Sequence, residues 1–103
     1  MDPLLYRTGV DAETLASRLS AAFAAIRPEL PFATSIIDHQ DRPWPFTSVH
    51  CHPPGLQMLE YGNVALHGGR ALVWSGTVPE AGWRRLLAEL SDILTADAQL
   101  LGR

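Results

Sequence analysis

The sequence predicts one two-layer α+β domain, in which a short antiparallel sheet of about four strands is flanked by an N-terminal and a C-terminal amphipathic helix. Three observations lead to this fold class. The chain has 103 residues, which suits a single domain covering residues 1–103. Apolar residues repeat with the period of a helix near both ends of the chain. The segment between them is rich in β-branched residues and is interrupted by turn-forming glycine and proline.

The first element is a helix predicted over Asp11–Arg27. Asp11 is a favourable N-cap residue, and Val10 and Leu15 have the spacing of a hydrophobic staple across the start of the helix. Pro28 ends the helix, because the residue before a proline avoids helical backbone angles. The apolar stripe of this helix consists of Leu15, Leu19, Ala22, Phe23 and Ile26.

The middle of the chain is predicted to form strands separated by turns. The predicted strands are Phe32–Asp38, Phe46–His52, Leu56–His67 and Arg70–Ser75. The Gly68–Gly69 pair fits a two-residue hairpin turn, because glycine tolerates the positive φ angles that such turns need. Side chains alternate along a strand, so His50 and His52 share one face and Cys51 lies on the other.

A second helix is predicted over Pro79–Thr95. Thr77 and Glu80 have the spacing of a capping box, in which each side chain binds the backbone N–H of the other residue. The predicted buried stripe is Trp83, Leu86, Leu87, Leu90, Ile93 and Leu94. Two helices would cover one face of the sheet and leave the other face open.

Charge and composition argue against several classes of partner. The net charge is −3, whereas nucleic-acid binding by phosphate neutralisation needs a basic face, so we expect no nucleic-acid partner. The apolar stretch Ala21–Ile26 is far shorter than the ~20 residues that span a bilayer, so we expect no membrane association. The start lacks the basic segment of a signal peptide, and the single cysteine, Cys51, cannot form an internal disulfide. We expect a cytoplasmic protein, and the use of arginine alone as the basic residue indicates a GC-rich bacterial genome.

The apolar content is higher than one buried sheet face requires. Hydrophobic residues make up 47% of the chain, and the predicted strands from Leu56 onward carry large apolar side chains on both faces. A second copy of the chain, a different protein, or the N-terminal segment Leu4–Tyr6 could cover the second face. We expect a homodimer first, because two-fold homodimers are the commonest soluble oligomers.

Three aromatic residues are the predicted interaction residues: Trp44, Tyr61 and Trp74. Trp44 lies between Pro43 and Pro45, which makes it stiff enough to anchor an interface. The same tryptophan can instead fold back onto the edge of its own sheet. Tyr61 and Trp74 lie on the predicted strands that carry apolar residues on both faces.

The histidines are the one group that resembles a reactive site. His50 and His52 lie two residues apart on a predicted strand, so both imidazoles point to the same face and can chelate a transition metal. His39, Glu60 or His67 could supply a third ligand, and His39 completes the predicted metal set. The simpler interpretation is that these are exposed histidines on the polar face of an edge strand.

Histidine catalysis without a metal is a further hypothesis. His39 is flanked by Asp38 and Asp41, which could tune it as a general base. No nucleophile-elbow, P-loop, dinucleotide-binding or C-x-x-C motif accompanies it. We therefore assign no catalytic residue from the sequence.

Two known families share fragments with this histidine region. His50-x-His52 followed by Glu60 and Gly62 resembles the first motif of the cupins, but here the glutamate lies too far along the chain and no second motif follows. His52-Pro53 and the apolar residues after it resemble the strand region of pterin-carbinolamine dehydratases, in which a helix rather than a strand precedes the histidines. Each resemblance covers a small part of the chain, so no residue role is carried over.

The sequence favours a small non-enzymatic binding or accessory protein that acts through protein–protein interaction as a homodimer. This hypothesis needs no cofactor, and its partner is the chain itself or another protein. The alternative is a small metal-binding or histidine-dependent enzyme centred on the strand that carries His50 and His52, with a transition metal as its cofactor.

Overall fold

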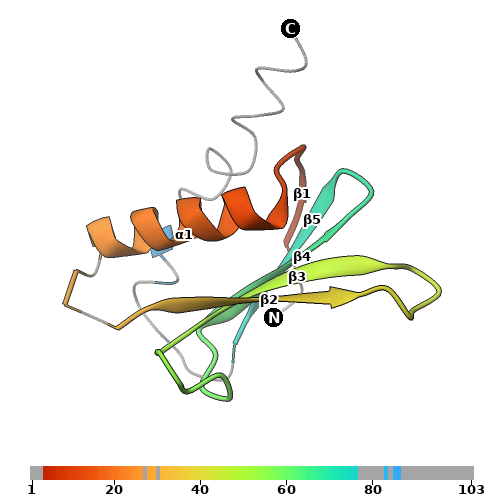
Figure 1. Ribbon diagram of the computed structural model, residues 1–103. Coiled ribbons are helices and arrows are strands. Elements are labelled where there is room, and N and C mark those ends of the chain that lie inside the picture. Colours follow the sequence, from red (N-terminus) through yellow and green to blue (C-terminus); the bar gives the residue numbers. More distant parts are fainter. Residues whose placement is uncertain (1–3, 27, 30, 77–82, 84, 87–103) are drawn as a thin grey trace, which may run out of the picture.

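The computed structural model describes residues 4–26, 28, 29, 31–76, 83, 85 and 86. Its elements are β1 (Leu4–Arg7), α1 (Ala12–Ile26), β2 (Ala33–His39), β3 (Phe46–His52), β4 (Gly62–His67) and β5 (Arg70–Ser75). The strands form one antiparallel sheet in the order β1-β5-β4-β3-β2. α1 lies across one face of this sheet (Figure 1). No helix among the described residues is long and apolar enough to cross a membrane.

The helix α1 confirms the predicted N-terminal helix. Oδ1 of Asp11 accepts the backbone N–H of Thr14 at 2.7 Å, which is the contact expected of an N-cap residue. Leu15, Leu19 and Phe23 recur every four residues and are fully buried against the sheet. The apolar stripe of the sequence is therefore the face that packs on the strands.

The hairpin between β4 and β5 also confirms its prediction. Gly68 and Gly69 have φ angles of 56° and 77°, and the residues on either side, His67 and Arg70, pair across the turn. Positive φ at both central positions is the geometry of the turn whose twist matches that of the strands. This turn fixes the register of β4 against β5 and hence which side chains share a face.

The predicted strand Leu56–His67 is too long, because β4 begins only at Gly62. Gly55 adopts a φ of 75°, and the backbone N–H of Leu56 binds the carbonyl of Pro53 at 3.0 Å, which turns the chain away from β3. The chain returns to the sheet where the N–H of Tyr61 binds the carbonyl of Cys51 at 2.7 Å. The apolar residues between Leu56 and Tyr61 therefore belong to a turn segment rather than to a strand.

The predicted fold class, a sheet of about four strands flanked by N- and C-terminal helices, is wrong. The sheet has five strands, because Leu4–Arg7 pairs with β5. The described residues contain one helical element, α1, and are mostly β. The sequence of β1 does not show the alternation of apolar and polar residues that is typical of a strand, because Leu4 and Leu5 are adjacent. This edge strand instead forms by pairing with its neighbour. Much of the predicted helix Pro79–Thr95 lies outside the described residues; Trp83 and Leu86 of its stripe are described and buried.

The core lies between α1 and one face of the sheet. Phe23 stacks on Phe32 with ring centroids 4.3 Å apart, and on Tyr61 with centroids 5.5 Å apart. The buried apolar residues are Val10, Leu15, Ala16, Leu19, Phe23, Val49, Cys51, Tyr61, Val64, Ala71, Val73, Trp83 and Leu86. The members of this cluster on β3, β4 and β5 all lie on the α1 side of the sheet.

Candidate functional site on the open face of the sheet

The face of the sheet that points away from α1 carries the candidate site, and we call it the open face. Strand register and the alternation of side chains define its members. They are Leu5 and Arg7 on β1, Arg70, Leu72 and Trp74 on β5, Asn63, Ala65 and His67 on β4, Phe46, Ser48, His50 and His52 on β3, and Ala33, Ser35, Ile37 and His39 on β2.

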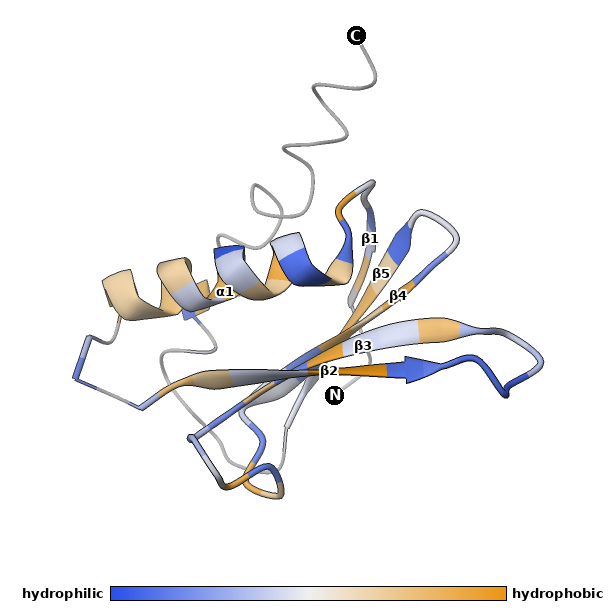
Figure 2. Ribbon diagram, in the orientation of Figure 1, coloured by the Kyte–Doolittle hydropathy of each residue, from blue (hydrophilic) through white to orange (hydrophobic). Residues whose placement is uncertain are grey.

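Large apolar side chains are exposed on this face. Leu5 is 61% exposed, Leu72 38% and Trp74 41%, and Leu5 pairs directly with Leu72 across β1 and β5. Ile37 on β2 is 45% exposed. Figure 2 shows apolar residues along the strands beneath α1 as well as on α1 itself. A sheet face turned to water normally carries polar residues, so these side chains need an explanation.

A chain of hydrogen bonds crosses the polar half of the open face. Oγ of Ser48 lies 3.1 Å from Nε2 of His39 and 2.8 Å from Nε2 of His50. Nδ1 of His50 contacts Oε1 of Glu60, and Oε2 of Glu60 accepts the amide N–H of Asn63 at 3.1 Å. This series of hydrogen bonds therefore joins β2, β3 and β4 and ends on the carboxylate of Glu60.

The carboxylate of Glu60 determines which atom donates in each of these hydrogen bonds. An ionised Glu60 can only accept, so Nδ1–H of His50 donates to it. Nε2 of a neutral His50 then accepts the hydroxyl proton of Ser48, and Nε2–H of His39 donates to the Ser48 oxygen. Ser48 is only 3% exposed, so its hydroxyl serves as a link between two imidazoles and is poorly placed to attack a substrate.

His52 lies apart from this chain. Its Nδ1–H donates to the carbonyl of Pro53 at 2.8 Å, and its Nε2 accepts the hydroxyl of Ser35 at 2.7 Å. Two of the three predicted metal ligands, His39 and His50, lie together around Ser48. The third, His52, has both ring nitrogens hydrogen-bonded to other groups, Ser35 and Pro53. Over the residues that the structure describes, no cluster of three or more His, Cys, Asp or Glu side chains is arranged to hold a metal ion.

The predicted interaction residues have different environments. Trp44 is 74% exposed in the β2–β3 loop, so it does not fold back onto the sheet edge, and Trp74 is exposed on the open face. Tyr61 is 4% exposed, and its hydroxyl donates to the carbonyl of Pro31 at 2.9 Å. Trp44 and Trp74 are therefore available to a partner, whereas Tyr61 belongs to the core.

The loop that carries Trp44 is held against the open face. Nδ1–H of His67 donates to the carbonyl of Pro45 at 2.6 Å, and His39 stacks on Phe46 with centroids 4.2 Å apart. A depression of about 520 Å³ lies beside this loop, lined by Arg42, Pro43, Trp44, Phe46, His67 and Leu72. It extends the apolar surface from β5 to the loop.

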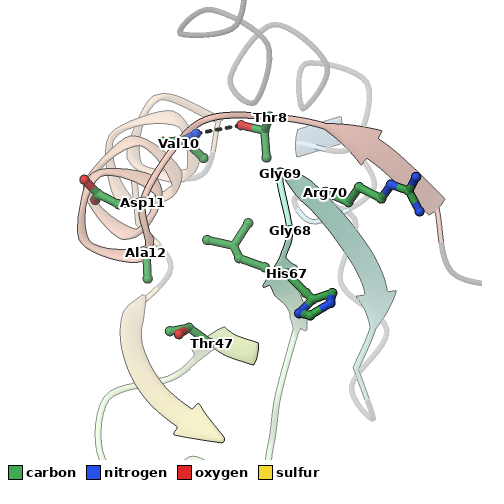
Figure 3. Close-up of a pocket in the computed structure, with 10 residues that line it drawn as sticks. Thr8, Val10, Asp11, Ala12, Thr47, His67, Gly68, Gly69 and Arg70 are labelled. Carbon is green, nitrogen blue, oxygen red and sulfur yellow. Dashed lines mark hydrogen bonds between the residues drawn. The ribbon is translucent and has the colours of Figure 1, made fainter. Parts of the chain in front are cut away.

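A second depression lies at the start of α1, between the helix and the β4–β5 turn (Figure 3). Its volume of about 250 Å³ is below the ~300–1,000 Å³ that is typical of small-molecule sites. The carboxylate of Asp11 already caps α1, and Arg70 extends away from the cavity in Figure 3. This cavity therefore presents backbone and short side chains rather than a reactive set.

Cys51 is fully buried on the α1 side of β3. Burial, and to a lesser extent the negative charge of Glu60, raises the pKa of the Cys51 thiol far above its ordinary value. A thiol in this state is not a nucleophile at neutral pH. Cys51 therefore packs as a small apolar side chain, as its place opposite His50 and His52 predicts.

Comparison with known proteins adds no family to this description. No family model matches the chain, and neither a curated protein nor a solved structure matches it. Sequence reasoning gave Ser48 no role as the link between two histidines, and it considered Leu5 only within the segment Leu4–Tyr6 that could cover the second face. The alternation of Ser48 with His50 was a usable signal, whereas Leu5 depends on the unpredicted pairing of β1 with β5.

Proposed function

We propose that the protein is a small interaction module that forms a homodimer through the open face of its sheet. The observation that supports this proposal is the exposure of Leu5, Leu72 and Trp74 side by side on one face, at 61%, 38% and 41%. Contiguous exposed apolar surface of this kind is characteristic of protein–protein contact sites. Trp44 extends the surface, and exposed tryptophan is a common anchor of interfaces.

The size of the face places the dimer among small interfaces. Five strands spaced about 4.8 Å apart, each contributing about six residues of ~3.3 Å, give a footprint of roughly 24 by 20 Å. This is about 480 Å² per copy, below the ~800 Å² per partner of a standard interface. We therefore expect a weak, reversible dimer.

Sedimentation equilibrium over a range of concentrations tests this proposal. Leu72→Asp places an unpaired carboxylate in the centre of the interface, so it is expected to weaken dimerisation about a hundredfold. Leu56→Asp is the matched control, because Leu56 is 52% exposed but lies outside the open face. A wild-type chain that stays monomeric at millimolar concentration, or equal weakening by both substitutions, would contradict the proposal.

We propose transition-metal binding as the second candidate, favoured by the convergence of two imidazoles. Nε2 of His39 and Nε2 of His50 point at the same oxygen of Ser48, and Glu60 orients His50 in the way that carboxylates orient metal-binding histidines. Rotation of Ser48, with the proton of His39 moved from Nε2 to Nδ1, would free both Nε2 atoms for a weakly bound ion completed by water.

Zinc and nickel titration by calorimetry checks this second candidate. His50→Ala should abolish binding, whereas His52→Ala should retain it, because both ring nitrogens of His52 are used within the protein. Circular dichroism of each variant confirms that it is folded before titration. Equal binding by the wild type and His50→Ala rules this site out.

A further inference from the structure

We infer that the two copies stack their open faces about a two-fold axis that runs across the strands, so that Arg70 of each copy lies over Trp74 of the other. This inference rests on the proposed homodimer and adds the orientation of the second copy. It follows from the distribution of charge along the strands and from the order of side chains on β5.

The arginines of the open face lie at one end of its strands. Arg7 and Arg70 are exposed and directly opposite each other on β1 and β5, next to the β4–β5 turn. Arg42 lies in the β2–β3 loop at the same end of the sheet, together with Asp41. Glu60 lies at the opposite end, where its carboxylate holds His50 and Asn63. We call these the arginine end and the glutamate end.

The orientation of the axis decides which ends meet. Two faces can be stacked only by a two-fold axis that lies in the plane between them. In aligned sheet packing this axis runs either along the strands or across them. An axis along the strands places the two arginine ends together, and an axis that runs over β5 sets Arg70 against Arg70, where like charges repel. An axis across the strands places the arginine end of each copy over the glutamate end of the other, so charge complementarity selects the second arrangement.

The outward side chains of β5 fit this arrangement. Arg70, Leu72 and Trp74 follow one another on the open face at intervals of two residues. With the axis passing over Leu72, each strand β5 lies on its counterpart, and Leu72 meets Leu72. Arg70 of each copy then meets Trp74 of the other, and a guanidinium over an indole face is a favourable cation–π contact. Both contacts form at once, because Arg70 and Trp74 are equidistant from Leu72.

The outward side chains of β1 and β4 also fit this arrangement. Leu5 pairs with Leu72 across β1 and β5, so both leucines lie in the row of residues along the axis. On β4 the exposed His67 of one copy lies over the Asn63 and Glu60 of the other.

Cross-linking with a short bis-maleimide tests the orientation with single-cysteine additions on β5. With this reagent, Leu72→Cys should cross-link to itself, because the two Leu72 positions meet at the axis. Arg70→Cys alone should not, since each Cys would face a tryptophan. A mixture of Arg70→Cys and Trp74→Cys should cross-link across the chains. The reagent is needed because stacked sheets lie about 10 Å apart, whereas a direct disulfide requires Cα atoms within about 7 Å. This mixed dimer retains one native Arg70–Trp74 contact, so the test does not remove the interaction it measures.

The native thiol does not interfere with this experiment. Cys51 is fully buried and its pKa is raised by burial, so the wild-type chain should give no cross-link and serves as the control. An axis along the strands predicts a different product: self-cross-linking of Asn63→Cys if it runs over the central strand β4, or of Arg70→Cys if it runs over β5. That product, or the absence of the Arg70→Cys and Trp74→Cys heterodimer, would overturn the inferred orientation.

Sedimentation of the same samples separates the two levels of the proposal. A dimer that fails to give the predicted cross-links contradicts the orientation and leaves the homodimer in place. A chain that is monomeric in sedimentation contradicts the homodimer itself. Arg70→Glu provides a second variant without cysteine chemistry: it should weaken the dimer at least tenfold, because it removes the cation over Trp74 and places a carboxylate next to Glu60 of the second copy. Unchanged affinity in Arg70→Glu would also overturn the orientation.

Discussion

Asp11 determines where the helix begins. Its Oδ1 accepts the backbone N–H of Thr14 at 2.7 Å. The backbone and side-chain hydrogen bonds from Thr14 favour the charged carboxylate and lower the pKa of Asp11 below its ordinary value. The stability that this charge contributes is therefore fully present above the ordinary carboxyl pKa of about 3.9, and is lost as the pH falls through the lowered value.

Asp11→Ala is expected to unfold at a lower temperature than the wild type at neutral pH, because one orphan N–H loses its partner. The difference between the two proteins should shrink as the pH falls below about 4, where the wild-type carboxylate becomes protonated. Thermal melts followed by circular dichroism across this range measure the effect. Asp11→Asn keeps an acceptor at the N-cap and is the uncharged control. A difference that stays constant down to about pH 2 would show that the charge has no role.

Part of the candidate site can be predicted from the residues of one strand. Alternation along Phe46–His52 predicts that His50 and His52 share a face and that Cys51 is buried, as the structure shows. It does not predict that Glu60 joins His50. That contact exists because the turn segment after His52 returns to the sheet through the Tyr61–Cys51 hydrogen bond, which depends on the three-dimensional path of the chain.

At the scale of elements, the start of β4 depends on close packing with Trp83. A Cβ atom added to Gly62 would overlap the indole ring of Trp83, which is itself 2% exposed. Gly62 pairs with Cys51 on β3 and Ser75 on β5, so it lies in the centre of the sheet. A glycine within a strand often marks such a close approach by another part of the molecule.

Gly62→Ala should destabilise the fold by about 1–3 kcal/mol, because the added methyl group overpacks a buried contact. Urea unfolding measures the free energy of unfolding. The double variant Gly62→Ala, Trp83→Leu is the informative control: with a smaller side chain opposite, the added cost of Gly62→Ala should fall below about 1 kcal/mol. Equal costs in both backgrounds would show that Trp83 does not limit this position.

The elements with a strong local signal are predicted well. The predicted bounds of Phe46–His52 and Arg70–Ser75 are the bounds of β3 and β5, because alternation and a glycine turn determine both. β1 could not be predicted, since Leu4–Arg7 becomes a strand only by pairing with β5 (Arg70–Ser75), which is distant in the sequence. The prediction of a sheet flanked by two helices was wrong for the same reason, because it assigned the strands and helices from local sequence patterns alone.

At the scale of the whole molecule, the two faces of the sheet are distinct surfaces. One face packs on α1, with Val49 and Val64 fully buried, while Leu5 and Trp74 are exposed on the other. Among the described residues, one helical element, α1, packs on the five-stranded sheet, and the other face is large enough for a weak interface. Part of the excess of apolar residues that the sequence indicates, Leu5, Leu72 and Trp74, thus lies on the open face, where the proposed second copy would cover it.

The most direct test of this account is a dilution series of amide NMR spectra on uniformly ¹⁵N-labelled protein. If the open face forms a homodimer, amide shifts should change with concentration in β1, β4 and β5, centred on Leu72, and the α1 amides of Ala12–Ile26 should stay constant. Spectra that do not change up to millimolar concentration, or changes centred on α1, would contradict the proposed interface.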